Sequence, residues 1–197
     1  MTRLAVRSIA PKSGDRLSAH PCSRRASMKR LLFLLAFLPS GAVAAPDPCA
    51  SAPPLAEPWT SWTQSGSVMA GATLSSAPRI ILGKPVTATL RPTPQVQFAV
   101  PPGKSVPKSH AGLFTLAVKD AARIGIALSA AAWVDAATGA TALASAAHEH
   151  GPRCSGIRKI VWFDLPPGLH AIQIAGALNP SIRIMAADAR ANQPLPR

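Results

Sequence analysis

The residues best suited to chemistry lie in one segment, 148–154, which reads His-Glu-His-Gly-Pro-Arg-Cys. It holds two of the five histidines and one of the three cysteines of the chain. If the segment is extended, side chains alternate between its two faces, so His148 and His150 would lie on one face about 6–7 Å apart. That spacing allows both imidazoles to bind one metal ion, and copper, zinc and iron all accept imidazole.

A complete metal site would need a further ligand. Two histidines and one carboxylate would suit a non-haem iron centre. Glu149 would face away from the histidines in an extended segment, so Asp135 or His170 would have to supply the third ligand. The candidate metal ligands are therefore His148, His150, Asp135 and His170. The alternative is structural: the Gly-Pro pair after the histidines makes a turn, and the histidines cap exposed backbone groups.

Cysteine usage predicts a disulfide. Two cysteines, Cys49 and Cys154, follow the N-terminal leader described below, and an even count in an exported chain indicates pairing. Such a bond would close a loop of about 100 residues and add at most about 4–5 kcal/mol in the chain-entropy description. The alternative is that Cys154 is a free thiol or a metal ligand.

Other catalytic arrangements find little support in the sequence. It contains no G-x-S-x-G motif, no phosphate-binding glycine loop and no C-x-x-C pair. Trp133 and Asp135 would share one strand face, where the carboxyl could act as a proton-transfer group or begin the following turn. Arg158 could pair with Asp164 or Glu149, which would be a structural role.

Residues 28–44 have the three parts of a secretory signal. A basic head, Met28-Lys29-Arg30, precedes the apolar run 31–38, and Ala42-Val43-Ala44 ends the segment. The apolar run is far shorter than the roughly 20 residues that span a bilayer as a helix. We expect cleavage near Ala44 and a periplasmic or secreted protein, with no transmembrane segment in the mature chain.

Residues 1–27 carry six basic side chains against Asp15 alone. They are interpreted as a disordered extension upstream of a start at Met28. Alternatively, segment 23–29 (Ser-Arg-Arg-Ala-Ser-Met-Lys) resembles a twin-arginine export signal. Ser27 stands where that signal has Phe, and the apolar run is strongly hydrophobic; both features favour the ordinary export route.

The charge distribution argues against a nucleic-acid partner. Of the formal net charge of +13, residues 1–44 contribute eight basic and one acidic side chain. The remaining basic residues are scattered, and the chain has no Tyr and only five Phe to stack on bases. A protein or glycan of the cell envelope is the expected partner.

Hydrophobic periodicity predicts the fold. Residues 45–78 are rich in Pro, Ala and Ser and indicate an extended tail, with Trp59 and Trp62 as packing anchors or, less commonly, a sugar-stacking pair. From Arg79 the chain alternates apolar and polar residues in short runs, which indicate strands. These runs are 86–91, 95–100, 114–119, 123–128, 133–135, 161–165, 171–174 and 182–184.

Turn signals at 101–103, 137–139, 166–168 and 179–180 separate these runs. The expected fold is therefore all-β: an antiparallel, jelly-roll-like β-sandwich of about eight short strands over residues 79–188, followed by a tail, 189–197. The Ala-rich stretch 140–147 could be a helical turn or a return strand after Gly139.

The order of these elements resembles bacterial pre-peptidase C-terminal-like sandwich domains. The resemblance rests on 113–118, 122–128, 133–135 with the Gly139 turn, and 165–174. His170 stands where that family's signature has an aromatic residue. The resemblance implies a small accessory or binding domain without catalysis of its own.

The block His148-Glu149-His150-Gly151-Pro152-Arg153-Cys154-Ser155-Gly156-Ile157-Arg158-Lys159 is similar to a family of small secreted alphaproteobacterial proteins. The resemblance covers most of residues 45–187. Some members carry the name homogentisate 1,2-dioxygenase. The enzyme of that name is a larger intracellular cupin-type protein that binds iron with two His and one Glu, and only the local His-Glu-His matches it here.

These observations favour an exported, non-catalytic binding or structural module of unknown ligand. The alternative is a small metalloprotein or metal-dependent dioxygenase, with copper, zinc or iron at His148 and His150.

Overall fold

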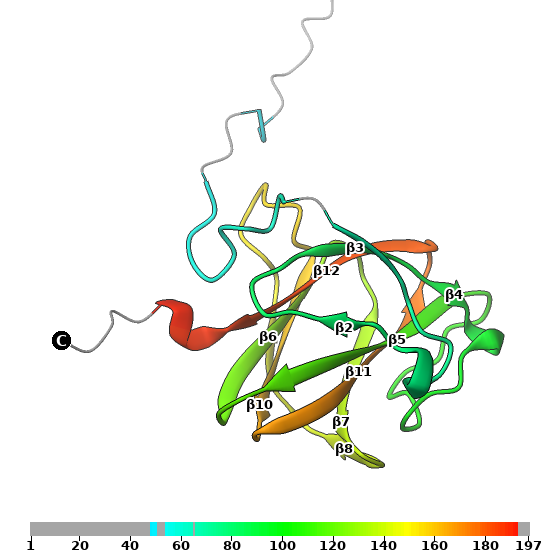
Figure 1. Ribbon diagram of the computed structural model, residues 1–197. Helices are drawn as coiled ribbons and strands as arrows, with labels where there is room; N and C mark the ends of the chain where they lie inside the picture. The colour runs from blue at the N-terminus through cyan, green and yellow to red at the C-terminus, as the bar shows by residue number, and fades with distance from the viewer. Residues whose placement is uncertain (1–47, 51–53, 65, 193–197) are drawn as a thin grey trace, which may run out of the picture. The chain divides into compact units, whose positions relative to one another are not determined.

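The computed structural model describes residues 48–50, 54–64 and 66–192 (Figure 1). The expected leader, 1–44, and residues 193–197 lie outside this part of the chain. All described residues belong to one unit. None of the helices in the described part is long and apolar enough to cross a bilayer.

The first sheet has the order β1-β3-β12-β6-β10-β9. Its pairs are antiparallel except β1 with β3, which run parallel. The strands are β1 Ser67–Met69, β3 Val86–Thr89, β12 Ser181–Asp188, β6 Ala122–Leu128, β10 Lys159–Leu165 and β9 Ser145–Glu149.

The second sheet has the order β2-β5-β11-β7-β8, and β4 also pairs with β5. Here β2 runs parallel to β5 and the other pairs are antiparallel. The strands are β2 Arg79–Ile80, β5 His110–Val118, β11 Gly168–Ala177, β7 Trp133–Thr138, β8 Thr141–Leu143 and β4 Arg91–Pro92. Three short 3-10 helices complete the described elements: η1 Leu74–Ser76, η2 Thr93–Gln95 and η3 Ala189–Asn192.

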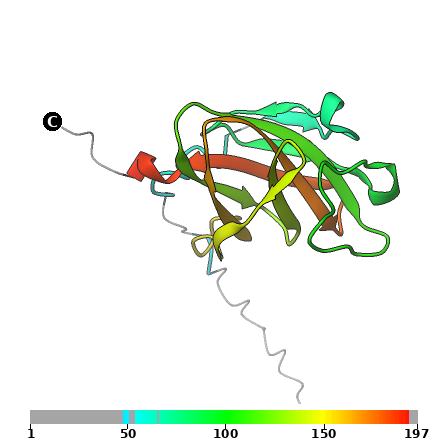
Figure 2. The ribbon, with the colours of Figure 1, turned by 90° about the horizontal axis from the view of Figure 1, so that it is seen from below.

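The two sheets pack face to face, and Figure 2 shows them from below. The alternating apolar positions of both sheets supply one core, as period-two strands require. From the first sheet come Ile124, Ile126, Leu128, Val161, Phe163, Leu165, Ile182 and Ile184; from the second come Phe114, Leu116, Val134, Ile172 and Ile174. The prediction of an all-β sandwich is confirmed.

Two details of the predicted sandwich were wrong. The described part of the chain holds twelve strands rather than about eight, and both sheets are mixed rather than purely antiparallel. The additional strands β1, β2 and β4 have only two or three residues each, too few to show a period in sequence. The Ala-rich stretch forms the return strands β8 and β9, after a turn in which Gly139 adopts φ +58°.

Residues 95–100 were predicted to form a strand and do not. Pro94 lies in η2, and residues 96–100 form no ladder. The fully buried Gln173 of β11 replaces the ladder: its Oε1 accepts hydrogen bonds from Ala99 N and Val100 N at 3.2 and 3.3 Å, and its Nε2 donates to Val100 O at 2.9 Å. One side-chain amide thus satisfies three backbone groups of this segment.

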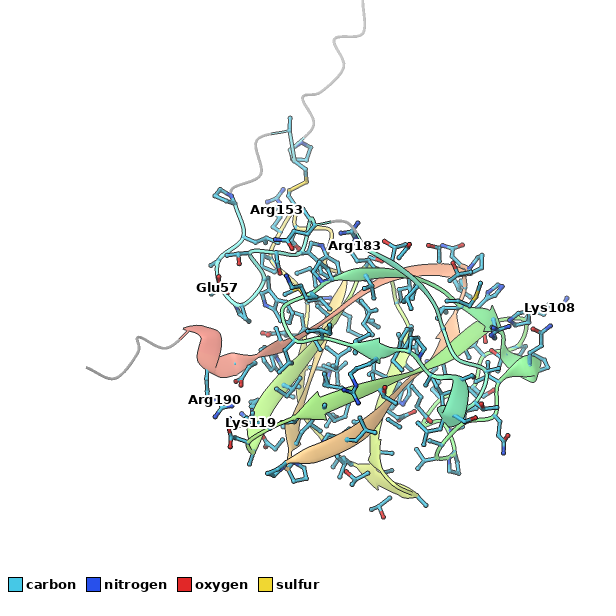
Figure 3. The ribbon with its side chains drawn as sticks, viewed as in Figure 1. Glu57, Lys108, Lys119, Arg153, Arg183 and Arg190 are labelled. Atoms are coloured by element: carbon cyan, nitrogen blue, oxygen red, sulfur yellow. A yellow bond between two sulfur atoms is a disulfide. The ribbon has the colours of Figure 1, made fainter. Side chains whose placement is uncertain are left out.

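The outer face of the first sheet is covered by the segment before β1. Trp59 and Trp62 are 6% and 3% exposed and pack with Ile160 and Met185 of that face. Arg183 of β12 donates from Nη1 to Trp62 O at 2.7 Å and Gln64 O at 2.8 Å. Figure 3 labels Arg183 near this segment. The prediction that the two tryptophans are packing anchors is confirmed, and β1 and η1 also lie inside the expected 45–78 tail.

Candidate functional site

Segment 148–154 is joined by a disulfide to residues 48–50, which precede the covering segment in sequence. Cys49 and Cys154 are bonded, with their Cα atoms 5.2 Å apart and a sequence separation of 105. Figure 3 shows the bond beside Arg153. The predicted disulfide is confirmed, and Cys154 is therefore neither a free thiol nor a thiolate ligand.

His148 lies near the end of β9, an edge strand of the first sheet, and His150 is the first residue after it. Both side chains are exposed, and both line one hollow of about 330 Å³. We call it the histidine hollow; it is lined by Ala131, His148, Glu149, His150, Arg158 and Lys159. The two imidazoles that the sequence singled out therefore meet at one site.

His150 is oriented by the chain that faces it. Its Nδ1 lies 3.1 Å from Arg158 O and 3.4 Å from Arg158 Nη1. One ring nitrogen of a neutral imidazole either donates or accepts, so these contacts are alternatives. The shorter contact makes Nδ1 the donor to the carbonyl and leaves the lone pair on Nε2.

Glu149 is turned toward the covered face. Its Oε1 accepts a hydrogen bond of 2.8 Å from Nε1 of Trp162. Trp162 in turn contacts Trp59, with ring centroids 6.0 Å apart. Glu149 was expected to point away from the histidines. Its carboxylate is hydrogen-bonded to Trp162, which contacts Trp59 of the segment that covers this side of the sandwich.

The other two candidate ligands lie in the second sheet, on β7 and β11, and each is held by its own hydrogen bonds. His170 is fully buried; its Nε2 donates to Pro166 O and its Nδ1 contacts Thr138 Oγ1, both at 2.8 Å. Asp135 accepts from Trp133 Nε1 at 2.7 Å and from Gly103 N and Gln173 Nε2 at 3.2 Å. Within the described ranges, no group of three or more His, Cys, Asp or Glu side chains is placed to hold a metal ion.

A second hollow, of about 280 Å³, adjoins the first and shares Ala131 and Lys159 with it. We call it the tryptophan hollow, and the two together the Lys159 groove. The lining of the tryptophan hollow combines two lysine ammonium groups with an apolar floor. It consists of Lys104, Lys159, Trp133, Val106, Ala131, Ala132, Ala175 and Gly176.

Trp133 is held as one wall of this hollow. Trp133 is 38% exposed, although it is the first residue of β7 and pairs with Ala175 of β11. Besides the bond to Asp135, it packs against Gly103, where a Cβ atom would overlap the ring. The Pro-Pro-Gly turn before Lys104 therefore needs glycine at its third position to approach the indole.

Lys159 forms the boundary between the two hollows. Its ammonium lies 5.3 Å from the centroid of the Trp133 ring and donates to Ala132 O at 3.2 Å. Burial lowers the pKa of Lys159 from its ordinary value, and the neighbouring Lys104 lowers it further, while Asp135 acts in the opposite direction. Two mutually repelling ammonium groups thus face one open hollow.

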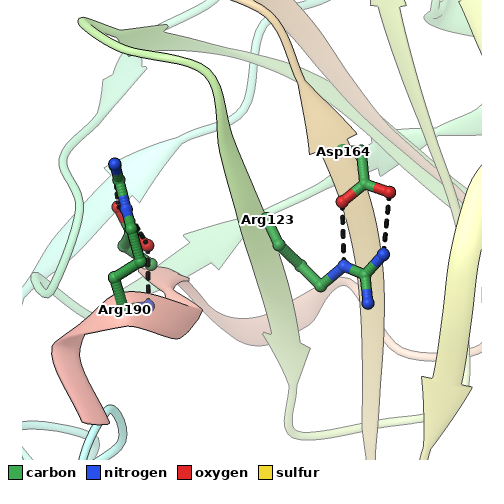
Figure 4. A network of polar contacts seen from close by, with 4 residues as sticks. Arg123, Asp164 and Arg190 are labelled. Atoms are coloured by element: carbon green, nitrogen blue, oxygen red, sulfur yellow. Dashed lines mark hydrogen bonds and ion pairs between the residues drawn. The ribbon is translucent and has the colours of Figure 1, made fainter. Parts of the chain in front are cut away.

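The acidic partners expected for Arg158 are used elsewhere. Asp164 receives two hydrogen bonds of 2.8 Å from Arg123, as Figure 4 shows. The hydrogen bonds from Arg123 lower the pKa of the Asp164 carboxyl, and Asp164 raises that of Arg123. The predicted Arg158–Asp164 pair is therefore wrong, and Arg158 lines the histidine hollow instead.

Sequence reasoning identified the histidines and Trp133 but missed Lys104 and Lys159. These two lysines lie 55 residues apart, one in an irregular loop and one at the start of β10. No local motif links them. They meet because Gln173 and Asp135 hold segment 99–103 against the end of the second sheet.

Comparison with protein-family models and with curated proteins finds no match for this chain.

Proposed function

We propose that the chain is an exported, non-catalytic β-sandwich module that binds a ligand in the Lys159 groove. The observation that carries the proposal is Lys159 itself. Its half-buried ammonium, flanked by an indole and a second lysine, faces two open hollows and has a lowered pKa. Burial of a cation without an ion pair costs free energy, and a bound ligand group would offset that cost.

Rigid support of the groove favours a binding role. Trp133, Gly103 and Gln173 all donate to the Asp135 carboxylate, so the wall and the loop of the tryptophan hollow are fixed by one group. Recognition sites are commonly apolar clefts with a few well-placed polar groups. No catalytic arrangement is needed to explain these contacts.

Export is supported by two features. The segment 28–44 has the composition of a secretory signal, and the Cys49–Cys154 disulfide is of the kind that persists in oxidising compartments. The resemblance to small secreted proteins through the block 148–159 supports the same proposal. Expression of the full chain in a Gram-negative host should yield a periplasmic product beginning near Ala45; an uncleaved cytoplasmic product would contradict export.

The binding proposal is tested by a ligand screen with the exported protein labelled with ¹⁵N. Pools of neutral oligosaccharides, acidic oligosaccharides and short peptides are added separately, and backbone and indole N–H signals are followed. At least one pool should move the signals of Trp133, Lys159 and Ala131, and a Trp133→Ala variant should lose that response. Ligands that move only signals elsewhere on the sandwich would contradict the proposal.

A second candidate function is a small metalloprotein, which the orientation of His150 favours. Metal-binding histidines usually donate their other ring N–H to a carbonyl or carboxylate, and His150 Nδ1 faces Arg158 O. Asp135 and His170 are engaged elsewhere, so the described residues do not assemble the two-histidine, one-carboxylate iron site of a dioxygenase. Two imidazoles with solvent oxygens would suit copper(II) better.

Metal content of untagged protein purified from the periplasm tests this alternative. Stoichiometric copper, zinc or iron that is lost in the His148→Ala, His150→Ala variant would establish it. Metal-free protein that also fails to take up copper on titration would rule it out. His110→Ala, which changes a histidine on β5, serves as the matched control.

A further inference from the structure

The two hollows of the Lys159 groove adjoin each other. Lys159 and Ala131 line both, and the volumes are similar, about 280 and 330 Å³. Both are open to solvent rather than enclosed. A ligand that lies across both would therefore pass over the Lys159 ammonium with one part on each side of it.

The charges that line the groove are predominantly positive. Lys104 and Lys159 face the tryptophan hollow, and Lys159 and Arg158 face the histidine hollow. The one carboxylate in the lining, Glu149, is engaged by Trp162 Nε1, and the nearby Asp135 accepts three hydrogen bonds. An anionic ligand would relieve the repulsion between the two lysines on either side of its negative group.

The floor between these charges is apolar. In the tryptophan hollow it consists of Val106, Ala132, Ala175 and Gly176 beside the Trp133 indole. A ligand that fits both the floor and the rim needs a ring with one apolar face and a negative group on its edge. A pyranose ring that carries a carboxylate has both properties.

We propose that the groove binds an acidic oligosaccharide with uronate rings in successive positions, one ring in each hollow and a carboxylate at Lys159. This inference rests on the proposed function, because it assigns a ligand class to the same groove. Single-stranded nucleic acid, which is also polyanionic, fits less well. Its successive bases stack on several aromatic rings, whereas Trp133 is the one Trp, Phe or Tyr ring in the described lining of the two hollows.

The ligand pair that tests the inference is trigalacturonate and its fully methyl-esterified form, which has the same rings without the negative charges. Calorimetric titration of the exported, disulfide-bonded protein should detect the acid and show at least about tenfold weaker binding of the ester. Binding of the acid should weaken as ionic strength rises, because exposed charges are screened.

Two double variants test whether the lysines of the groove are responsible for trigalacturonate binding. The Lys104→Gln, Lys159→Gln variant removes two charges and keeps polar side chains, each one atom shorter, and it should weaken trigalacturonate binding about tenfold or more. The Lys84→Gln, Lys119→Gln variant has the same net charge but changes lysines outside the groove, and its affinity should stay within about twofold. Lys119, labelled in Figure 3, follows β5 and precedes β6, whereas Lys159 pairs with the far end of β6. Equal thermal unfolding temperatures of the two variants would exclude a folding defect.

The possible outcomes separate the inference from the proposed function. Equal binding of acid and ester, both lost in the Trp133→Ala variant, would overturn the acidic ligand class and leave the groove as a binding site. Equal weakening by both double variants, or equally tight binding of oligodeoxythymidylate, would also overturn the inference. Binding of neither sugar would overturn the inference alone, since the mixed ligand screen tests the groove independently.

Discussion

Two tryptophan sites in this sandwich have a cation next to an indole, and they differ in what remains for the cation to do. Arg183 lies 5.9 Å from the centroid of the Trp62 ring and donates to two backbone carbonyls, while Trp62 is almost fully buried. Lys159 lies 5.3 Å from the Trp133 ring and donates to one carbonyl, while Trp133 is 38% exposed. The first site closes a surface, and the second leaves a cation and an indole at an open groove.

The same pair of residue types, a cation beside an indole, can therefore either stabilise the fold or form part of an open binding surface. At the closed site the chain supplies its own ligand: the Trp59–Trp62 segment occupies the outer face of the first sheet. At the Lys159 groove nothing in the described part of the chain covers the corresponding surface. Variants of the closed site should therefore change stability, and variants of the open site should change binding.

The largest expected effect on stability comes from removing the Trp62 indole at the closed site. Trp62→Ala should lower the free energy of unfolding by about 3–5 kcal/mol, because it removes a buried indole from the cluster with Ile160 and Met185. Trp133→Ala is the matched variant at the open site and should cost about 1 kcal/mol, since its indole is partly exposed. Equilibrium urea unfolding measures both; equal losses would contradict the comparison.

The Cys49–Cys154 disulfide should contribute nearly as much as Trp62 to the free energy of unfolding. Cys49→Ser with Cys154→Ser should lower the free energy of unfolding by about 4 kcal/mol, since the bond closes a loop of 105 residues in the unfolded chain. Urea unfolding of the double variant and of wild-type protein in reducing buffer, each compared with oxidised wild-type protein, measures the loss. The two should agree, and ligand binding at the Lys159 groove should persist at low temperature. A variant that folds as stably as the wild type would contradict this account.

Gln173 should have an intermediate effect and connects stability with the groove. Gln173→Leu keeps the volume but leaves Ala99 N, Val100 N and Val100 O without their partner, which should cost about 2–3 kcal/mol. Because this amide also donates to Asp135, the variant should weaken ligand binding too. Urea unfolding and calorimetry check the two effects. Gln64→Leu, a change of the same type at an exposed position, should affect neither.

The smallest expected effect concerns pH. The hydrogen bond from Arg190 lowers the pKa of Asp188, and Figure 4 shows this pair. Because the folded-state pKa is depressed, the pair stabilises the fold above the ordinary aspartate range, near pH 4. The stabilisation is lost as pH falls through the lower folded pKa. The contribution of a surface pair should be below about 1 kcal/mol. Unfolding curves of Asp188→Asn between pH 2 and pH 7 should show less loss in acid than wild type; identical curves would contradict it.

Much of the sandwich could be predicted from sequence because its long strands direct large apolar side chains to the core in alternate positions. Runs such as Ile124-Gly125-Ile126 and Val161-Trp162-Phe163 show period two, and they form β6 and β10 as expected. The 95–100 run shows the same period, but its backbone is hydrogen-bonded to the side chain of Gln173 instead of pairing with the backbone of a strand. A long-range contact of this kind leaves no local signal.

The candidate site was only partly predictable, for a similar reason. The histidines stand out because one residue separates them in sequence, and the structure brings both to one hollow. Asp135 and His170 stood out by type, yet their hydrogen bonds hold them in the second sheet. Lys104 and Lys159 were missed because their proximity depends on the loop fixed by Asp135.

The central claim is that the Lys159 groove binds an acidic sugar while the Trp59–Trp62 surface is closed. The four tryptophans give four indole N–H signals, from Trp59, Trp62, Trp133 and Trp162. On titration with trigalacturonate, the account predicts that the Trp133 signal shifts in a saturable manner while those of Trp59 and Trp62 stay fixed. A shift of the Trp59 or Trp62 signal with an unchanged Trp133 signal would contradict it.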